Sequence, residues 1–274
     1  MHGRVLIIAG SDSGGGAGIQ ADIKSVTAMA AYAMTAITAL TAQNTQGVFG
    51  IHAVPEDFIR RQIELCLTDI GADCIKTGML ATAGTIETVV KALGVFAPKV
   101  PLVADPVMVA KGGAALLEPS AIDAVRRLLL PRAALITPNL PEAEALIGRK
   151  IGSASEMQAA GEALLALGPK AVLMKGGHLP GPRVHDVLVT AGEARVFESP
   201  RIETRHTHGT GCTLASAIAA GIAQGLPLVD AVIRARAYVQ AAIKHAPGYG
   251  KGHGPLDHAV TVDPTLIEEG FKEA

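Results

Sequence analysis

Short runs of aliphatic residues alternate with longer stretches of helical period, and this alternation constrains the fold most. The first apolar run, Val5–Ala9, predicts a buried strand. Residues 16–31 follow it and repeat apolar side chains at helical spacing, on the face of Ile19, Ile23, Val26 and Ala30. Further strands are expected at Met34–Thr41 and near 73–76, 101–104, 133–136 and 171–174.

Helical stripes occupy the intervals between these strands. They are marked by Ile59–Ile70, Ile86–Leu93 and Ile122–Leu129, with further helices near 155–167, 212–224 and 228–245. Val184–Thr190 and Ala194–Glu198 are expected to pair as an antiparallel hairpin. Strand–helix alternation of this kind predicts an α/β fold, a mostly parallel central sheet with helices on both faces. Without a linker or internal repeat, residues 1–274 are interpreted as one domain.

Charge and cysteine usage narrow the classes of function. The formal net charge is -1 with no basic block, which argues against nucleic acid or an anionic membrane as the main partner. The three cysteines lack metal spacing, and an odd count makes a poor disulfide framework. The apolar run after Arg4 is too short for a signal peptide, and no stretch approaches the roughly 18 apolar residues of a membrane span. We therefore expect a cytoplasmic protein.

The loops after six predicted strands are polar and rich in glycine. In chain order they read G-S-D-S-G-G-G-A-G, T-A-Q-N-T-Q-G, K-T-G-M-L, D-P-V-M-V-A-K-G-G, T-P-N-L-P-E and K-G-G-H. Ligands of open α/β sheets bind where the carboxyl ends of parallel strands meet. Six such loops on one rim therefore predict a ligand-binding site.

The run His208-Gly209-Thr210-Gly211-Cys212-Thr213 precedes an alanine-rich predicted helix. Glycines at a helix start expose backbone N–H groups, and the helix dipole favours negative charge there. The run therefore suits a phosphate or a phosphoryl-transfer transition state. An ordinary glycine-rich helix entry, with Cys212 packed as a small hydrophobe, explains the same residues equally well. A thiol at a helix start is expected to have a lowered pKa, which favours the functional interpretation.

Several rim residues carry two interpretations. Glu142 can help to hold Mg²⁺, although Asn139 as an N-cap with Glu142 in a capping box explains the same segment. Asp105 precedes a proline and suits a turn as well. Lys175 can meet ATP phosphates or be an exposed strand-end lysine, and Gln43 offers an amide to a heterocycle edge from a strand-end loop. A Walker loop, a dinucleotide fingerprint and a zinc-binding histidine set are not found.

Taken in order, these motifs resemble the hydroxymethylpyrimidine/phosphomethylpyrimidine kinases of thiamine biosynthesis, in the ribokinase-like superfamily. The likeness runs from A-G-S-D-S-G-G-G-A-G-I-Q-A-D-I-K through T-A-Q-N-T-Q-G-V, K-T-G-M-L, D-P-V-M-V-A-K-G-G, T-P-N-L-P-E-A-E and L-M-K-G-G-H to T-H-G-T-G-C-T. The run Gly250–Pro255 resembles the family's C-terminal glycine segment. Ser13 in place of a proline and Thr77 in place of an isoleucine are small departures.

The resemblance implies a three-layer sandwich, Mg²⁺ and ATP as cofactor and phosphoryl donor, and a homodimer. It also implies two successive reactions, from hydroxymethylpyrimidine to its monophosphate and then to the diphosphate. It places the pyrimidine at Gly10, Asp22, Gln43, Met79 and Val107, and Mg²⁺ at Asp105 and Glu142. It places the nucleotide phosphates at Lys175, Asn139, Thr210 and Gly211, and the reacting centre at Gly209, Thr210, Gly211 and Cys212.

Most ribokinase-like sugar kinases carry an aspartate base where Cys212 stands. Our hypothesis is that a thiol acts as a thiolate in the alcohol step without adding a permanent charge beside the phosphate acceptor of the second step. The nearest alternative is a pyridoxal or pyridoxine kinase of the same superfamily. A non-catalytic nucleotide-binding regulator and a dehydrogenase are alternatives from other classes.

Overall fold

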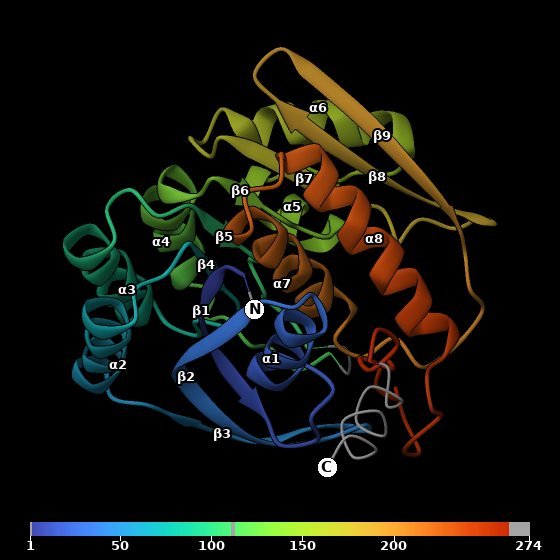
Figure 1. Cartoon of the computed structure of the whole chain (residues 1–274). Helices are drawn as coiled ribbons and strands as arrows, with labels where there is room; N and C mark the ends of the chain where they lie inside the picture. Colours follow the sequence, from blue (N-terminus) through green and yellow to red (C-terminus); the bar gives the residue numbers. More distant parts are fainter. Residues whose placement is uncertain (1, 111–112, 263–274) are drawn as a thin grey trace, which may run out of the picture.

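The computed structural model describes residues 2–110 and 113–262. Within these ranges one nine-stranded sheet forms the centre, in the order β3-β2-β1-β4-β5-β6-β7-β8-β9 (Figure 1). The strands are β1 Arg4–Asp12, β2 Tyr32–Asn44, β3 Gly47–Ala53, β4 Cys74–Thr77, β5 Leu102–Ala104, β6 Leu135–Ile136, β7 Ala171–Lys175, β8 Arg183–Thr190 and β9 Glu193–Pro200. Every strand predicted from the apolar runs is confirmed.

β2, β1, β4, β5, β6 and β7 are mutually parallel. At one edge β3 pairs antiparallel with β2, and at the other β8 pairs antiparallel with β7 and β9 with β8. The mostly parallel sheet and the β8–β9 hairpin are therefore confirmed. The prediction that Gln43 lies in a strand-end loop is wrong. β2 continues through Asn44 because Gln43 pairs with Val48 of β3, a strand that the sequence pattern did not indicate.

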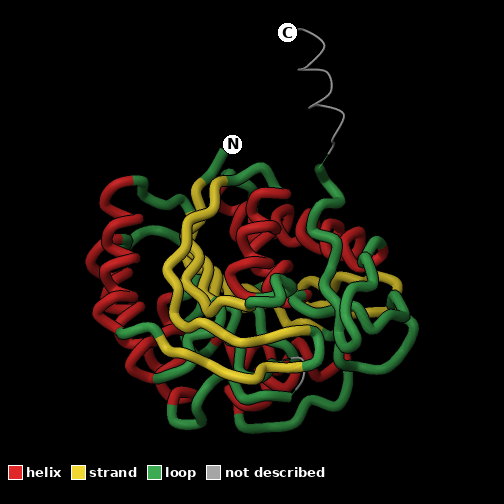
Figure 2. Tube along the Cα trace, turned by 90° about the horizontal axis from the view of Figure 1, so that it is seen from below, coloured by secondary structure: helices red, strands yellow, loops and turns green. Residues whose placement is uncertain are grey.

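Helices cover both faces of the sheet, as Figure 2 shows for the red coils on the two sides of the yellow strands. The helices are α1 Gly18–Ala28, α2 Glu56–Asp69, α3 Ala83–Phe96, α4 Ala121–Ala124, α5 Leu140–Ile147, α6 Ala154–Leu165, α7 Thr210–Ala223 and α8 Leu228–Lys244. One buried cluster joins α1, α7 and α8 to the sheet, and the other joins α2, α3, α5 and α6 to the opposite face. The expected three-layer arrangement is confirmed.

One predicted helix is irregular. The stripe Ile122–Leu129 begins as α4, continues as the π-helical turn η1 Val125–Leu129 and ends in the 3₁₀ turn η2 Leu130–Arg132. Pro131 lies in η2 and cannot donate a backbone hydrogen bond, so a regular α-helix does not continue there. In the described chain, no helix is both long and apolar enough to cross a membrane.

The strand order reverses direction at β1. From β1 the chain goes to β2 on one side, and from β4 it goes to β5 on the other. The loops that leave the carboxyl ends of β1 and β4 therefore diverge and open a crevice at the rim, where open α/β sheets bind their ligands. The N-terminal half of α7 packs over β4, β5 and β1 beside this point.

Candidate active site

Helix α7 begins at the predicted anion-binding turn. Gly209 is its N-cap, with φ of 82°, and no side chain of the described residues caps the first turn. A Cβ at Gly209 would lie 1.8 Å from the carbonyl oxygen of Gly16, so only glycine fits. The turn is thus pressed against the glycine-rich loop after β1. The Thr210 N–H donates to the Thr207 carbonyl at 3.4 Å, and the next N–H groups of the first turn have no intrahelical carbonyl to bond.

A buried cluster of charged side chains faces this turn from the neighbouring strand ends. Lys175 Nζ donates to Asp105 Oδ1 at 2.8 Å, and the hydroxyl of Thr137 donates to the same oxygen at 2.9 Å. The carboxylate of Glu142 lies 3.9 Å from Lys175 Nζ. A Cβ built on Gly211 would lie 3.2 Å from Lys175 Nζ, so the helix start and the lysine flank one small space.

The two interpretations of Asn139 and Glu142 both fit the geometry. Asn139 Oδ1 accepts from the Glu142 N–H at 2.9 Å, and Glu142 Oε2 accepts from the Asn139 N–H at 2.8 Å, so the capping box is confirmed. The remaining oxygen of Glu142 is not used by this box. The capping role is therefore shown, and a role of Glu142 at a ligand site stays a prediction.

Burial and close charges set the protonation of the cluster. Burial raises the pKa of Asp105, but the ammonium groups of Lys175 and Lys76 outweigh it, and the pKa is lowered. Burial raises the pKa of Glu142 to about 7, because Lys175 offsets only part of the desolvation. Burial lowers the pKa of Lys175, yet the carboxylates of Asp105 and Glu142 reverse this and raise it. At neutral pH the cluster thus carries a positive charge on Lys175 and a negative charge on Asp105, whereas Glu142 is close to its pKa.

The donor set fits Mg²⁺ bound together with a nucleotide. Among the described residues no group of three or more histidine, cysteine or acidic side chains could hold a metal alone. Mg²⁺ commonly takes one or two carboxylates and completes its shell with water and substrate phosphates. Asp105 and Glu142 supply such a pair beside the turn, and Mg²⁺ bound there would neutralise phosphate charge.

A lysine that the sequence analysis did not assign lies beneath the turn. Lys76 is fully buried, and its Nζ donates to both carboxylate oxygens of Asp22 at 2.8 Å. The Ser216 hydroxyl donates to the same carboxylate at 2.7 Å. Asp22 is 0% exposed and both its oxygens accept hydrogen bonds, so its expected contact with the pyrimidine stays a prediction. We interpret the Lys76–Asp22 pair as a buried structural ion pair beneath the site.

The expected lowering of the Cys212 pKa is wrong. Burial raises the pKa of this thiol to about 12, and the nearby charges of Asp22 and Asp105 reinforce the rise. Lys76 acts in the opposite direction but is already paired with Asp22. Desolvation therefore exceeds the help of the helix start, and the thiol is neutral at pH 7.

The other residues expected at the pyrimidine gather at the ends of β1, β2, β4 and β5. Gly10 ends the buried part of β1, and a Cβ there would lie 3.0 Å from Met79 Sδ. Met79 is buried, its carbonyl accepts from the Thr38 hydroxyl, and Val107 is half-buried two residues beyond Asp105. Gln43 lines a small pocket formed by Gln43, Asn44, Thr45, Val48, Ala110 and His208. Lys111 and Gly112, part of a loop motif noted above, lie outside the described residues.

A histidine and an aspartate at this pocket were also missed. His208 Nε2 lies 2.8 Å from Asp12 Oδ2 and 3.2 Å from the side-chain amide of Gln43.

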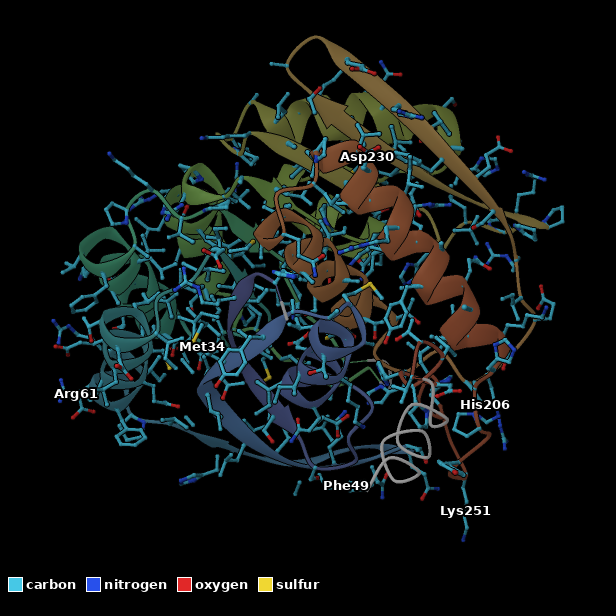
Figure 3. All side chains as sticks on the ribbon, in the orientation of Figure 1. Met34, Phe49, Arg61, His206, Asp230 and Lys251 are labelled. Carbon is cyan, nitrogen blue, oxygen red and sulfur yellow. The ribbon has the colours of Figure 1, made fainter. Side chains whose placement is uncertain are left out.

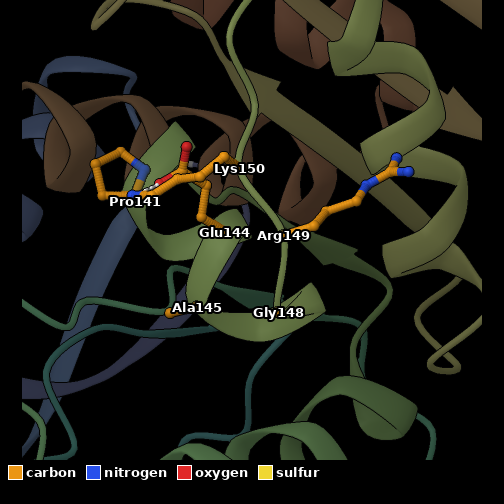
Figure 4. Close-up of a pocket in the computed structure, with 6 residues that line it drawn as sticks. All are labelled: Pro141, Glu144, Ala145, Gly148, Arg149 and Lys150. Atoms are coloured by element: carbon orange, nitrogen blue, oxygen red, sulfur yellow. Dashed lines mark hydrogen bonds and ion pairs between the residues drawn. The ribbon is translucent and has the colours of Figure 1, made fainter.

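A second, wider hollow lies along α5 and is lined by Pro141, Glu144, Ala145, Gly148, Arg149 and Lys150 (Figure 4). None of the clustered charges described above lines it, so we place the chemistry at the rim and not at this hollow.

A parallel sheet whose rim carries a glycine-rich helix start, a lysine and two acidic side chains is typical of a kinase of the ribokinase-like fold. The phosphomethylpyrimidine kinase family matches residues 12–257, and the chain belongs to this family. The thiamine biosynthesis bifunctional protein ThiED of Geobacter sulfurreducens is 49% identical over 96% of this chain, which spans only 53% of that protein.

Two further relatives match almost end to end. The hydroxymethylpyrimidine/phosphomethylpyrimidine kinase of Streptomyces coelicolor is 47% identical over 93% of each chain. The crystal structure of Bacillus subtilis pyridoxal kinase in complex with ADP is 38% identical and superposes with a TM-score of 0.88, over 95% of this chain and 98% of the other. The chain is therefore a phosphotransferase.

Proposed function

We propose that the protein transfers the γ-phosphoryl group of ATP to 4-amino-5-hydroxymethyl-2-methylpyrimidine, and then a second one to the resulting monophosphate, in thiamine diphosphate biosynthesis. The observation that carries this proposal is the meeting of two sites on one rim. The phosphate-binding turn of α7 faces Lys175 and Asp105, and the amide-lined pocket of Gln43 opens beside the same turn through His208.

In this proposal, different residues bind the transferred phosphoryl group and the metal ion. The backbone N–H groups of Gly209 and Gly211 and the ammonium of Lys175 are placed to hold charge on the transferred group, while the Thr210 N–H bonds the Thr207 carbonyl. Asp105 and Glu142 would hold Mg²⁺, which would neutralise phosphate charge, and Asn139 fixes Glu142 through the capping box. The acceptor oxygen bonds to the γ-phosphorus, the bond to the bridging oxygen breaks, ADP leaves, and the alcohol proton is released to water.

Our hypothesis for Cys212 has two parts, a thiolate in the alcohol step and the absence of a permanent charge in the second step. The neutral thiol favours the second part and not the first. It does not support a thiolate base for the alcohol step, because burial holds the thiol protonated. It does support an acceptor site to which Cys212 itself adds no negative charge. The acceptor of the second step is a phosphate monoester that is mostly a dianion at pH 7, and a neutral neighbour does not repel it.

The experiment is an assay of the purified protein with Mg²⁺, ATP and the pyrimidine alcohol, followed by mass spectrometry of the products. We expect the monophosphate first and the diphosphate later, with two ADP formed for each diphosphate. Formation of no phosphorylated pyrimidine would refute the proposal. The likeness to Bacillus subtilis pyridoxal kinase makes pyridoxal a second candidate substrate, and parallel assays with pyridoxal decide between them.

We also propose a homodimer in the cytoplasm. β3 forms one edge of the sheet, and its residues from Phe49 to Ala53 are exposed on both faces. Phe49 and Ile51 are 72% and 46% exposed, and Figure 3 shows Phe49 at the outer margin of the molecule. Exposed apolar edge strands are commonly covered by another chain. Free thiols at Cys66, Cys74 and Cys212 support a reducing compartment.

Phe49 provides a test of the dimer. Phe49→Asp places a charge on the exposed edge strand, so we expect it to shift the assembly towards the monomer in light scattering coupled to size exclusion. Val95, which is 67% exposed on α3, offers a matched control, because Val95→Asp adds the same charge elsewhere. A wild-type protein that is monomeric at micromolar concentration would contradict the proposal.

A further inference from the structure

The carboxylate of Asp12 is surrounded by hydrogen-bond donors. Its Oδ1 accepts from the Gly14 N–H at 2.8 Å, and its Oδ2 accepts from the Gly16 and Ala17 N–H groups at 3.2 and 2.8 Å. The side chain of Asp12 is 3% exposed. Backbone N–H groups only donate, so both carboxylate oxygens act as acceptors towards the loop. Burial raises the pKa of Asp12, but His208 and the Gly14 and Ala17 N–H groups outweigh it and lower the pKa, so the side chain is a carboxylate.

This environment fixes the direction of the hydrogen bond to His208. Because Asp12 Oδ2 is an acceptor, the Nε2 atom of His208 2.8 Å away carries the proton and donates it. The same Nε2 faces the Gln43 side chain at 3.2 Å. A protonated ring nitrogen cannot accept a hydrogen bond, so the end of the Gln43 amide that faces it has to be the oxygen.

The other end of the amide leads to the same orientation. The Thr41 side-chain oxygen lies 3.2 Å from the amide of Gln43, and its single proton has a partner at 2.8 Å in the carbonyl oxygen of Ser11. Thr41 is then free to accept but not to donate, and it suits the NH₂ end of the amide. With the oxygen towards Thr41 and the nitrogen towards His208, both contacts are mismatched. A half-turn about the last side-chain bond removes both mismatches: Thr41 then accepts from the amide NH₂, and the Nε2–H of His208 is shared between Asp12 Oδ2 and the Gln43 oxygen.

We propose that Asp12 and His208 are positioning residues that hold the Gln43 amide with its oxygen towards His208 and its NH₂ towards Thr41. The backbone of Gln43 is held by the same loop, since its carbonyl accepts from the Ser13 hydroxyl and its N–H donates to Ser13 Oγ, each at 2.9 Å. Main chain and amide are thus both fixed from the loop after β1.

An amide held in one orientation can bond only one order of hydrogen-bond donor and acceptor along the edge of a heterocycle. After its bonds to His208 and Thr41, Gln43 retains one N–H and one oxygen lone pair for a ligand in the pocket. A 4-aminopyrimidine edge offers a ring-nitrogen acceptor beside an N–H donor, and the 4-oxo analogue offers the reverse order. Holding the amide in one orientation therefore discriminates between these two rings. This consequence for ligand choice rests on the proposed function, whereas the orientation itself does not.

The orientation is tested first on the ligand-free protein. ¹⁵N-labelled histidine spectra at pH 8 report which ring nitrogen carries the proton, and the resonances of His208 are found by their loss in His208→Phe. We expect the Nε2–H form in the wild type. A His208 ring protonated at Nδ1 alone would overturn the proposal, whatever the substrate of the enzyme proves to be.

The consequence is tested with 4-amino-5-hydroxymethyl-2-methylpyrimidine and its 4-oxo analogue. We expect the ratio of their kcat/KM values to fall by about tenfold or more in His208→Phe, with KM changing more than kcat. Phenylalanine keeps a planar ring against Gly16 but has no ring nitrogen. Thr41→Val should lower the ratio as well, and Thr41→Ser should keep it, since only serine retains the acceptor oxygen.

His245→Phe is the matched control, because His245 is exposed at the end of α8 and its ring nitrogen bonds the Ala241 carbonyl. Its ratio should equal that of the wild type. An unchanged ratio in a folded His208→Phe or Thr41→Val protein contradicts the proposal. Absence of any reaction with the pyrimidine in the wild type refutes the proposed function alone, and the histidine spectra still decide the orientation.

Discussion

In the proposed reaction, Cys212 brings a thiol without charge to the place where the acceptor is phosphorylated. Cys212→Asp would put a carboxylate there, within the field of Lys76 and next to Asp105. We expect phosphorylation of the monophosphate to fall about 10- to 100-fold further than phosphorylation of the alcohol, because a carboxylate repels a dianion by about 1–3 kcal/mol at a partly buried site. Separate initial rates with alcohol and monophosphate as acceptors measure the difference.

Cys212→Ser is the control for this substitution, because serine changes the size of the side chain but adds no charge. It should affect the two steps to a similar extent. Equal losses of both steps in Cys212→Asp would show that the neutral charge of Cys212 is not what admits the phosphate acceptor.

At the scale of an element, strand β4 carries a polar group without a partner. Thr77 is fully buried, and its hydroxyl has no hydrogen-bond partner in the described chain. Thr77→Val removes that hydroxyl and keeps the β-branched shape. We expect the free energy of unfolding to rise by about 1 kcal/mol, since a buried polar group without a partner costs about 1–3 kcal/mol. Urea denaturation followed by circular dichroism measures the change.

Thr38 on β2 is the matched control. It is 2% exposed, and its hydroxyl donates to the carbonyl of Met79 at 2.7 Å. Thr38→Val deprives that carbonyl of its donor, so it should lower the free energy of unfolding by about 1–3 kcal/mol. If both threonine-to-valine changes destabilised the protein alike, the unpaired hydroxyl of Thr77 would not be the cost that we assign to it.

The parts of the fold that local patterns determine were predicted. Buried parallel strands appear as continuous apolar runs, and the capping box of Asn139 and Glu142 is encoded within four residues. β3 was missed because nearly all its residues are exposed on both faces, so they show no alternation. Its short hairpin connection after Asn44 is the signal that could have indicated it.

The missed site residues depend on contacts between distant parts of the chain. His208 and Asp12 meet across 196 positions, and Lys76 and Asp22 across 54. A lysine in a short strand resembles an exposed residue until its partner is known. The apolar neighbours of Lys76 in β4 are the signal that could have indicated burial. The pKa of Cys212 was predicted in the wrong direction for the same reason, because desolvation arises from the packed site and not from the helix start alone.

At the scale of the whole molecule, the chain beyond α8 packs back against the start of α7, and His258 makes one of its contacts there. His258 Nε2 lies 2.9 Å from the hydroxyl of Thr213, next to Cys212, and both side chains are buried. The His258 carbonyl also accepts from the Tyr238 hydroxyl on α8. The segment after α8 further runs past the catalytic turn, where the His208 N–H donates to the Gly254 carbonyl at 3.1 Å.

This attachment predicts a pH-dependent stability. Burial lowers the pKa of His258 to about 4 from its usual 6.5, so the folded protein keeps this ring neutral while the unfolded chain takes up a proton. Its contribution is therefore present above pH 6.5 and is lost as the pH falls towards 4. Between pH 7 and pH 5 we expect the wild type to lose about 2 kcal/mol more free energy of unfolding than His258→Gln, which has no titrating ring. Urea titrations at both pH values measure this, with His245→Gln as the control for an exposed histidine. Equal pH dependence in wild type and His258→Gln would mean that the segment is not held to α7 by a neutral histidine.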